Sequence, residues 1–267
     1  MLNIVIFNWN YANFLKKLLN EIKTIVNKPE FRILICDDGS TDCSLDLMKN
    51  FISEFNAINV FIFESTEPNL GRKKPYQGQL ESLNKIMNSK YFSTSDHYWF
   101  MDADDYCNFS TLGPEFFKKI KSKKICFTKV KNITNEGLES NLSIKRTVLE
   151  SKNLFPSISV TSSIITSGEF LFNNKSYIFD ERFDDVWLDS RLNMLACLLK
   201  PEDIEYLNEY IFRLIHGSND SSKMSLLRIL RKQIHAHDYF KYIHKNKFMF
   251  NSRMCILSIL SKCYHKW

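Results

Sequence analysis

Strands and helices alternate along the first hundred residues, and this alternation constrains the fold more than any other feature of the sequence. Four runs of apolar, β-branched and aromatic residues predict strands, at residues 2–8, 31–36, 59–63 and 97–101. Three intervening segments carry apolar residues at helical spacing, at residues 13–26, 43–55 and 79–89. Strands that alternate with helices predict an α/β fold with a mostly parallel sheet and helices on both faces.

Polar residues are concentrated where three of these strands end. They follow the first, second and fourth strands and comprise Asn8, Trp9, Asn10, Asp37, Asp38, Asp102, Asp104 and Asp105. Ligands bind beyond the carboxyl ends of the strands in a sheet of this kind, so we expect the three clusters to face one crevice. Asp42, which closes the acidic turn, is predicted to cap the following helix instead.

The chemistry of these clusters points to a metal ion. Neither the GxGxxG nor the GxxxxGK[ST] signature occurs, which argues against dinucleotide and P-loop chemistry. Carboxylates repel phosphate groups, so a diphosphate beside Asp102 and Asp104 requires a divalent cation between them. Hard oxygen ligands favour Mg²⁺ or Mn²⁺ for that position.

The composition is that of an ordinary soluble globular protein. Of the 267 residues, 44% are hydrophobic and 25% are charged, which excludes a disordered or fibrous chain. The seven cysteines are odd in number and form no CxxC pair, so neither a disulfide framework nor a structural zinc site is expected. No apolar stretch approaches the roughly 20 residues that span a bilayer, and no signal-peptide pattern is present, so we expect a cytoplasmic protein.

A series of motifs runs through residues 1–220 in a fixed order. The segments that carry them are Asn3–Leu15, Ile35–Asp42, Pro75–Asn84, Phe100–Asp105, Phe183–Leu188 and Arg213–Asn219. Together they resemble the signatures of family 2 glycosyltransferases of the kind that builds bacterial surface glycans. Two positions depart from the pattern of that family, because Phe7-Asn8 replaces Pro-Thr and Asp184 replaces Glu.

The resemblance implies a Rossmann-like GT-A catalytic domain at residues 1–220, with a nucleotide-binding half at 1–105 and an acceptor-binding half at 106–220. It implies an inverting transfer of a sugar from a nucleotide-diphosphate donor, here a UDP-sugar, with Mn²⁺ or Mg²⁺ as cofactor. The acceptor is expected to be a glycan or a lipid-linked glycan in cell-surface polysaccharide synthesis. The nucleotide is expected to contact Asn8, Trp9, Asp38 and Asp102, with Trp9 against the base and Asp38 accepting a hydrogen bond from it.

The resemblance also implies the metal ligands and the catalytic base. Asp104 and His216 are expected to bind the metal. Asp105 is the alternative to Asp104 as a metal ligand. The acceptor hydroxyl must lose a proton as it attacks the anomeric carbon, which requires a carboxylate within hydrogen-bond reach. Asp185 matches the position of that base, and Asp184 is the second choice.

Structural alternatives stand beside these assignments. Asp184 and Asp185 are also suited to cap a helix, and His216 is also explained as an ordinary surface histidine. The hydroxyl-rich segment Ser157–Ser167 suits either an acceptor pocket or a plain strand. The basic residues Arg72–Lys74 suit either a diphosphate or a solvated loop.

Two other functional classes share part of this pattern. An Asp-x-Asp phosphatase also places paired carboxylates after a strand, but Tyr106 stands where that class needs Thr or Val. A non-catalytic carbohydrate-binding domain of the same fold is expected to lose its acidic residues, and this chain retains them.

The last 47 residues differ in charge from the rest of the chain. Residues 221–267 contain ten basic residues and one acid, a net charge of +9, whereas residues 1–220 contain 26 basic and 29 acidic residues, a net charge of −3. Ser221 or Ser222 is predicted to cap a helix with one apolar face formed by Leu226, Leu230 and Ile234. A second helical pattern spans Arg253–Trp267. This basic amphipathic tail either packs on the preceding residues or binds an anionic membrane surface at the inner face of the cell membrane. No nucleic-acid partner is expected, because no recognition module accompanies the charge.

Overall fold

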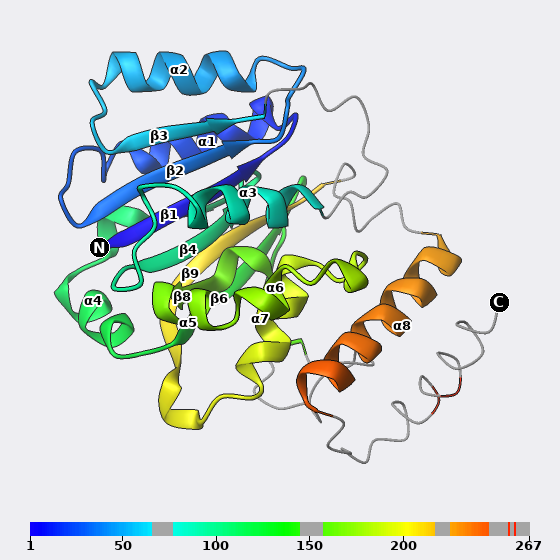
Figure 1. Ribbon diagram of the computed structural model, residues 1–267. Coiled ribbons are helices and arrows are strands. Elements are labelled where there is room, and N and C mark those ends of the chain that lie inside the picture. The colour runs from blue at the N-terminus through cyan, green and yellow to red at the C-terminus, as the bar shows by residue number, and fades with distance from the viewer. Residues whose placement is uncertain (66–76, 145–156, 217–224, 246–255, 257–258, 260–267) are drawn as a thin grey trace.

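The computed structural model describes residues 1–65, 77–144, 157–216, 225–245, 256 and 259, and its first hundred residues alternate strands with helices as predicted (Figure 1). The elements are β1 (Leu2–Asn8), α1 (Ala12–Ile22), β2 (Phe31–Asp37), α2 (Ser44–Glu54), β3 (Val60–Glu64), α3 (Gln77–Met87) and β4 (His97–Asp102). β1 pairs in parallel with β2 and with β4, and β2 pairs in parallel with β3. The largest difference from the prediction is at the end of α1, which stops at Ile22 rather than at Val26.

The second half of the chain adds antiparallel strands to this sheet. Its elements are β5 (Asp105–Cys107), η1 (Phe109–Thr111), α4 (Pro114–Lys121), β6 (Ile125–Thr134), β7 (Glu139–Leu142), η3 (Thr161–Ser163), β8 (Ile164–Ser167), α5 (Gly168–Asn173), α6 (Lys175–Ile178), η4 (Glu181–Phe183), α7 (Leu188–Ala196), η5 (Pro201–Asp203), β9 (Ile204–Ile215) and α8 (Leu226–Ile243). β8 is antiparallel to β4 and β6, whereas β9 is parallel to β6 and antiparallel to β5. The described residues thus form a nine-stranded mixed sheet in the order β3-β2-β1-β4-β8-β6-β9-β5, with β7 paired to β6.

Helices cover both faces of the sheet, and alternate residues of each central strand enter different cores. Ile4 and Ile6 of β1 pack in a core with buried residues of α1, α2 and α4. Val5 and Phe7 pack in a second core with residues of α3, α5, α7 and α8. All seven residues of β1 are buried because successive side chains point to opposite, covered faces. The predicted α/β fold with helices on both faces is confirmed.

Helix α8 belongs to the basic tail and packs against α7 and η4. It begins at Leu226, and the Ser225 hydroxyl caps it by accepting a hydrogen bond from the Arg228 amide at 3.3 Å. Leu230 is 41% exposed, so the predicted apolar face of Leu226, Leu230 and Ile234 is not buried as a whole. The buried side chains described are those of Ile234, Ala236, His237, Tyr239, Phe240 and Ile243.

Within residues 226–243, this packing favours the alternative in which the tail packs on the preceding residues. The predicted caps Ser221 and Ser222 lie outside the described residues. So does the second helical pattern, Arg253–Trp267, apart from the exposed Ile256 and Ile259. Across the described parts of the chain, we find no helix with both the length and the apolar character needed to cross a bilayer.

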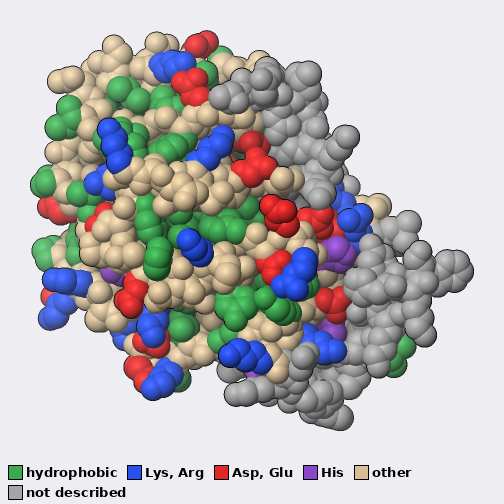
Figure 2. Space-filling view, in the orientation of Figure 1, with side chains coloured by type: hydrophobic (Ala, Val, Ile, Leu, Met, Phe, Trp, Pro, Cys, Tyr) green, Lys and Arg blue, Asp and Glu red, His purple; other side chains and the backbone are tan. Residues whose placement is uncertain are grey.

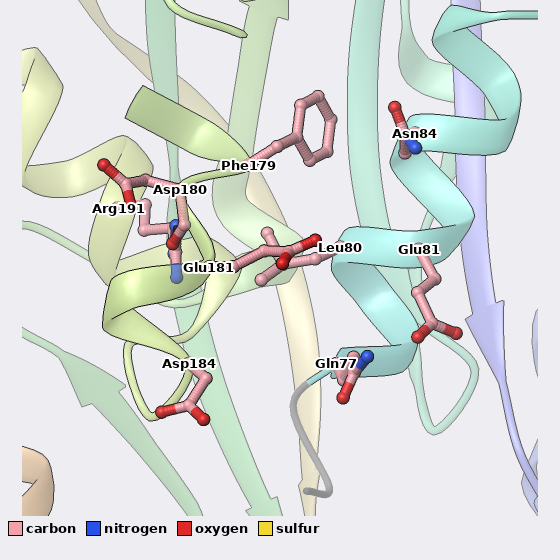
Figure 3. Close-up of a pocket in the computed structure, with 9 residues that line it drawn as sticks. All are labelled: Gln77, Leu80, Glu81, Asn84, Phe179, Asp180, Glu181, Asp184 and Arg191. Carbon is pink, nitrogen blue, oxygen red and sulfur yellow. Dashed lines mark hydrogen bonds between the residues drawn. The ribbon is translucent and has the colours of Figure 1, made fainter. Parts of the chain in front are cut away.

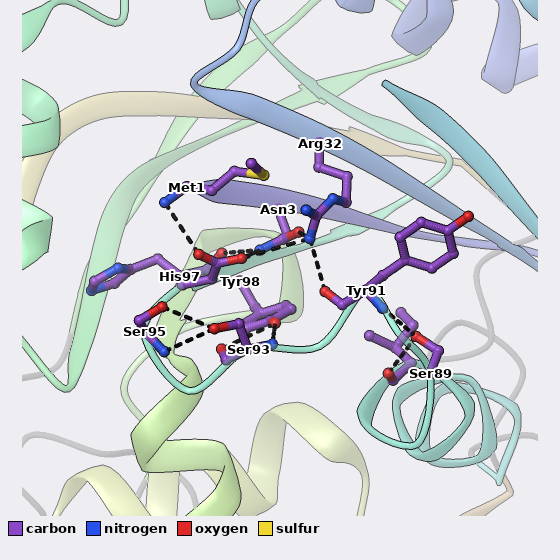
Figure 4. A network of polar contacts seen from close by, with 11 residues as sticks. Met1, Asn3, Arg32, Ser89, Tyr91, Ser93, Ser95, His97 and Tyr98 are labelled. Atoms are coloured by element: carbon purple, nitrogen blue, oxygen red, sulfur yellow. Dashed lines mark hydrogen bonds and ion pairs between the residues drawn. The ribbon is translucent and has the colours of Figure 1, made fainter. Parts of the chain in front are cut away.

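The polar residues at the amino ends of the strands pair with one another (Figure 4). The Asp96 carboxylate accepts a hydrogen bond from the Asn3 amide at 3.3 Å and lies 3.3 Å from the amino group of Met1. Arg32 lies 3.6 Å from the same carboxylate and donates to the Tyr91 carbonyl at 2.9 Å. Charges at this edge of the sheet are therefore compensated within the protein.

Candidate active site

The loops that follow β1 and β2 are tied together by Asp37. The Asn8 amide donates to Asp37 at 2.8 Å and to the Ser40 hydroxyl at 3.1 Å. Ser40 in turn donates to Asp37 through its backbone N–H at 2.9 Å and its hydroxyl at 2.6 Å. Asn8, predicted to contact the nucleotide, is only 2% exposed and faces this network. The network places Trp9 and Asp38, which are both partly exposed, at the ends of two adjacent strands.

Asp42 precedes Cys43, the N-cap residue of α2, so it is not the N-cap itself, but its carboxylate binds the starts of two helices. Its carboxylate accepts the backbone N–H of Ser44, the first residue of α2, and that of Ala12, the first residue of α1, both at 3.0 Å. Burial acts to raise the pKa of Asp42, but these hydrogen bonds outweigh it and lower the pKa. The acidic turn therefore joins the starts of two helices.

Three aspartates form a tight cluster between β4 and β5. Carboxylate oxygens of Asp102, Asp104 and Asp105 lie within 4.8 Å of one another. Burial, followed by repulsion from Asp104, raises the pKa of Asp105 to about 8. Burial and the two neighbouring carboxylates also raise the pKa of Asp102 well above its ordinary value, and Arg213 offsets this only in part. Despite Arg213, the three carboxylates remain crowded together, which is the situation that a bound divalent cation relieves.

His216 closes this cluster from the end of β9. Its Nε2 lies 2.9 Å from Oδ2 of Asp104, although the two residues are 112 positions apart. The imidazole is 7% exposed and stacks on Phe14 at a centroid distance of 4.2 Å, so the surface-histidine alternative is wrong. Three carboxylates and an imidazole form a donor set that fits Mn²⁺ or Mg²⁺.

Two residues that sequence reasoning did not assign hold Asp102 in place. The Gln79 side chain donates to Oδ1 of Asp102 at 2.7 Å, and the Ser162 hydroxyl accepts from the Asp102 backbone N–H at 3.0 Å. Ser162, Ser163 and Thr166 are fully buried, so these three hydroxyls are closed to solvent. Gln79 lies in the segment Pro75–Asn84, which pointed to it, whereas nothing in the sequence signalled the contact of Ser162 with β4.

Asp184 and Asp185 lie in the loop between η4 and α7. Trp187 is the N-cap residue of α7, so the alternative that the two aspartates cap this helix is wrong. Arg231 of α8 forms an ion pair with Asp185, with Nε 2.5 Å from Oδ2. His235 of α8 lies 3.7 Å from the same oxygen, and burial lowers its pKa although Asp185 acts to raise it. Sequence reasoning missed both partners because it treated the tail as a separate segment.

A cavity of about 310 Å³ opens beside Asp184 (Figure 3). It lies between α3 and residues 179–191, and its described lining consists of Gln77, Leu80, Glu81, Asn84, Phe179, Asp180, Glu181, Asp184 and Arg191. Arg191 is 1% exposed and donates to backbone carbonyls, among them those of Val186 at 2.8 Å and Ile178 at 2.8 Å. The guanidinium therefore fixes the wall of the cavity. Figure 2 shows acidic side chains gathered near this region with basic and histidine side chains beside them.

The structure describes all of the predicted site residues but not all of the predicted motifs. Asp102, Asp104 and His216 come together, and Trp9 and Asp38 lie at neighbouring strand ends of the same edge. Arg72–Lys74 and the Gly217–Asn219 part of the last motif lie outside the described residues.

The fold and site thus combine an α/β sheet, a metal-compatible acid cluster at its carboxyl edge and a second acid pair on a neighbouring loop. The sequence comparison gives the family. The model described as Glycosyl transferase family 2 matches residues 3–178, and the chain belongs to that family. The matching model is one of glycosyltransferases, so the comparison gives no support to the phosphatase alternative.

Two curated relatives are similar to part of the chain. An uncharacterized glycosyltransferase, MG060, of Mycoplasma genitalium is 27% identical over 124 residues, which are 46% of this chain and 38% of that protein. A poly(ribitol-phosphate) beta-glucosyltransferase of Bacillus spizizenii is 26% identical over 143 residues, which are 53% of this chain and 21% of that protein. The matched part spans well under half the length of either relative.

Solved structures share the fold. TarS residues 1–349 of S. aureus, crystallised with UDP, superpose with a TM-score of 0.59 at 17% identity, over 89% of this chain and 64% of that one. The mannosyltransferase PcManGT of Pyrobaculum calidifontis, crystallised with GDP-Man and Mn²⁺, gives a TM-score of 0.52 at 12% identity, over 97% of this chain and 68% of that one. At this level of identity the likeness confirms the predicted GT-A fold.

Proposed function

We propose that the protein is an inverting, metal-dependent glycosyltransferase that moves a sugar from a UDP-sugar to a glycan or lipid-linked glycan of the bacterial cell surface. The observation that carries the proposal is the cluster of Asp102, Asp104 and Asp105 closed by His216. A cluster of carboxylates with raised pKa values suits a metal-bound diphosphate, because the cation supplies the charge that the protein lacks.

The donor binds along the carboxyl ends of β1, β2 and β4 in this proposal. Trp9 lies against the base, and Asp38 accepts a hydrogen bond from it. Asn8 supports this loop through Asp37, and Asp102, oriented by Gln79, contacts the ribose or a metal-bound water. A bound nucleotide in TarS and in PcManGT supports a donor site of this kind.

Asp104 and His216 hold the metal, and Asp105 is the alternative ligand beside Asp104. Mn²⁺ or Mg²⁺, when bound, neutralises the leaving diphosphate as a Lewis acid. Asp104 and Asp105 are only 6% and 3% exposed, so the chain itself supplies a largely buried site for the ion.

Asp185 acts as the general base. It takes the proton of the acceptor hydroxyl while the new bond forms between that oxygen and the anomeric carbon, and the bond from the anomeric carbon to the diphosphate breaks. Attack from the face opposite the leaving group inverts the anomeric centre. Asp184 lines the cavity of about 310 Å³ and is the second choice for this role.

A thermal-shift screen of nucleotide diphosphates with and without Mn²⁺ or Mg²⁺ tests the proposal. We expect UDP with Mn²⁺ to raise the melting temperature more than either alone, because ligands that bind only the folded state stabilise it. Adenosine and guanosine diphosphates with the same ion are the controls for the base. Equal stabilisation by UDP in the presence of EDTA would contradict metal dependence.

The proposal includes a peripheral membrane partner for the tail. In the first half of α8, Ile229 and Leu230 are 39% and 41% exposed, and Arg228 lies beside them in the sequence. Exposed apolar residues among basic ones suit the surface of an anionic bilayer. The Ile229→Gln/Leu230→Gln variant should co-sediment less with phosphatidylglycerol vesicles than the wild type. Deletion of the tail is unsuitable, since it would remove the buried Tyr239 and Phe240 from the core.

A further inference from the structure

Helix α8 contacts the loop of the predicted catalytic base at three successive points. Phe183, just before Asp184, packs its ring edge-on against Tyr239 at a centroid distance of 5.3 Å. Trp187, two residues after Asp185, lies under the Lys232 ammonium, which is 3.3 Å from the ring centroid. Between these two contacts Arg231 reaches Asp185. The helix thus holds the loop on both sides of the two aspartates.

The ion pair with Arg231 is made at Oδ2 of Asp185. Oδ2 faces Arg231 Nε at 2.5 Å and has almost no exposed surface, whereas the Asp185 side chain as a whole is 21% exposed. The exposed part of the side chain therefore lies on its other atoms. Oδ1 is the oxygen that remains for an acceptor hydroxyl.

From these contacts we propose that Arg231 is a positioning residue for the transfer reaction. It binds Oδ2 of Asp185 and so aims Oδ1 at the acceptor. The inference rests on the proposed function, because it takes Asp185 as the base. A guanidinium keeps its charge at every working pH and forms directional contacts with a carboxylate, so it is suited to hold one oxygen and leave the other in place.

The surroundings of Arg231 make a stabilising role small. The Arg231 side chain is 50% exposed, and an ion pair at such a position contributes little to the free energy of unfolding. Helix α8 is anchored elsewhere, by the buried Ala236, Tyr239, Phe240 and Ile243. Removal of the guanidinium should therefore change the orientation of Asp185 while the helix stays folded.

The first test is to replace Arg231 and to measure UDP release with water as acceptor. The probe is whichever of UDP-glucose, UDP-galactose and their N-acetylamino counterparts stabilises the protein most in the presence of Mn²⁺. Arg231→Gln should lower kcat by about 10- to 100-fold, because misplacing a reacting group has effects of that order. The KM for the UDP-sugar and the thermal shift with UDP and Mn²⁺ should stay unchanged.

Three further measurements distinguish a positioning role of Arg231 from a purely structural role. Arg231→Lys keeps the charge and should recover part of kcat, and added guanidinium ion at millimolar concentration should recover part of kcat in Arg231→Ala. Lys241→Gln removes an exposed charge from the same helix and should keep wild-type kcat. All of these variants should melt within a few degrees of the wild type.

The outcomes distinguish this inference from the function on which it rests. If Asp185→Asn is inactive and Arg231→Gln keeps wild-type kcat, the role of Arg231 is overturned and the proposed function stands. If Asp185→Asn releases UDP at the wild-type rate, the assignment of the base fails and the role of Arg231 fails with it. A higher kcat in Arg231→Gln would also overturn the inference, because it would show that the ion pair restrains the base.

Discussion

The two acid clusters of this protein use the same residue types in opposite electrostatic situations. Asp102, Asp104 and Asp105 are crowded together, and burial with mutual repulsion raises the pKa values of Asp102 and Asp105. Asp184 and Asp185 form an equally compact group with His235, but Arg231 places a permanent cation 2.5 Å from Asp185. Proximity of carboxylates alone therefore does not mark a metal site. In the first cluster Arg213 offsets the repulsion only in part, whereas in the second Arg231 is paired directly with Asp185.

Replacement of Asp104 should have the largest effect. Asp104→Asn removes the carboxylate that contacts His216, so we expect at least about a 10³-fold loss of transfer together with loss of the Mn²⁺-dependent thermal shift of UDP. Asp96→Asn is the matched control, since Asp96 is paired within the protein at the opposite edge of the sheet. It should lower stability but leave the Mn²⁺ response intact. Full activity of Asp104→Asn would contradict the assignment of the metal site to the cluster of Asp102, Asp104 and Asp105.

Replacement of Asp185 should affect turnover alone. We expect Asp185→Asn to lower kcat by about 10²- to 10⁴-fold, the usual contribution of a general base, with the Kd for UDP and Mn²⁺ unchanged. Isothermal titration calorimetry and a UDP-release assay measure the two quantities. Asp184→Asn is the comparison variant, and a larger loss of kcat in that variant would transfer the role of base to Asp184.

The pH dependence of the Mn²⁺-induced shift in melting temperature is the smallest expected effect, and it tests the cluster of Asp102, Asp104 and Asp105 specifically. Because burial and Asp104 raise the pKa of Asp105 to about 8, the metal-free folded protein favours the protonated carboxyl and loses stability as pH rises from about 4 toward 8. Mn²⁺ favours the ionised form. We therefore expect Mn²⁺ to raise the melting temperature by several degrees more at pH 8.5 than at pH 6. An equal shift at both pH values would contradict the charge deficit of this cluster.

Local patterns predicted the parts of the molecule that depend on neighbouring residues. The strands β1, β2, β3 and β4 follow directly from runs of apolar residues, and their order in a parallel sheet brings Trp9, Asp38 and Asp102 to one edge. The motif that includes His216 suggested its meeting with Asp104, which a single histidine would not have indicated.

The parts that escaped prediction depend on packing between distant segments. The sequence does not show that Ser162 of η3 lies against the end of β4, or that the Asn8 amide donates to Asp37. The buried face of α8 was misplaced because its apolar residues continue around the helix, so the pattern alone did not select Ile234, Tyr239 and Phe240 over Leu230. Because the buried face of α8 was misplaced, the contact between Arg231 and Asp185 was not predicted.

The pairing of β5 with β9 sets the spacing of the metal ligands. β5 has three residues, and its register with β9 matches Asp105 with Arg213 and Cys107 with Ile211. Strand residues alternate between faces, so a shift of one position would turn His216 away from Asp104. A single insertion or deletion within residues 211–215 would therefore separate the two halves of the metal site.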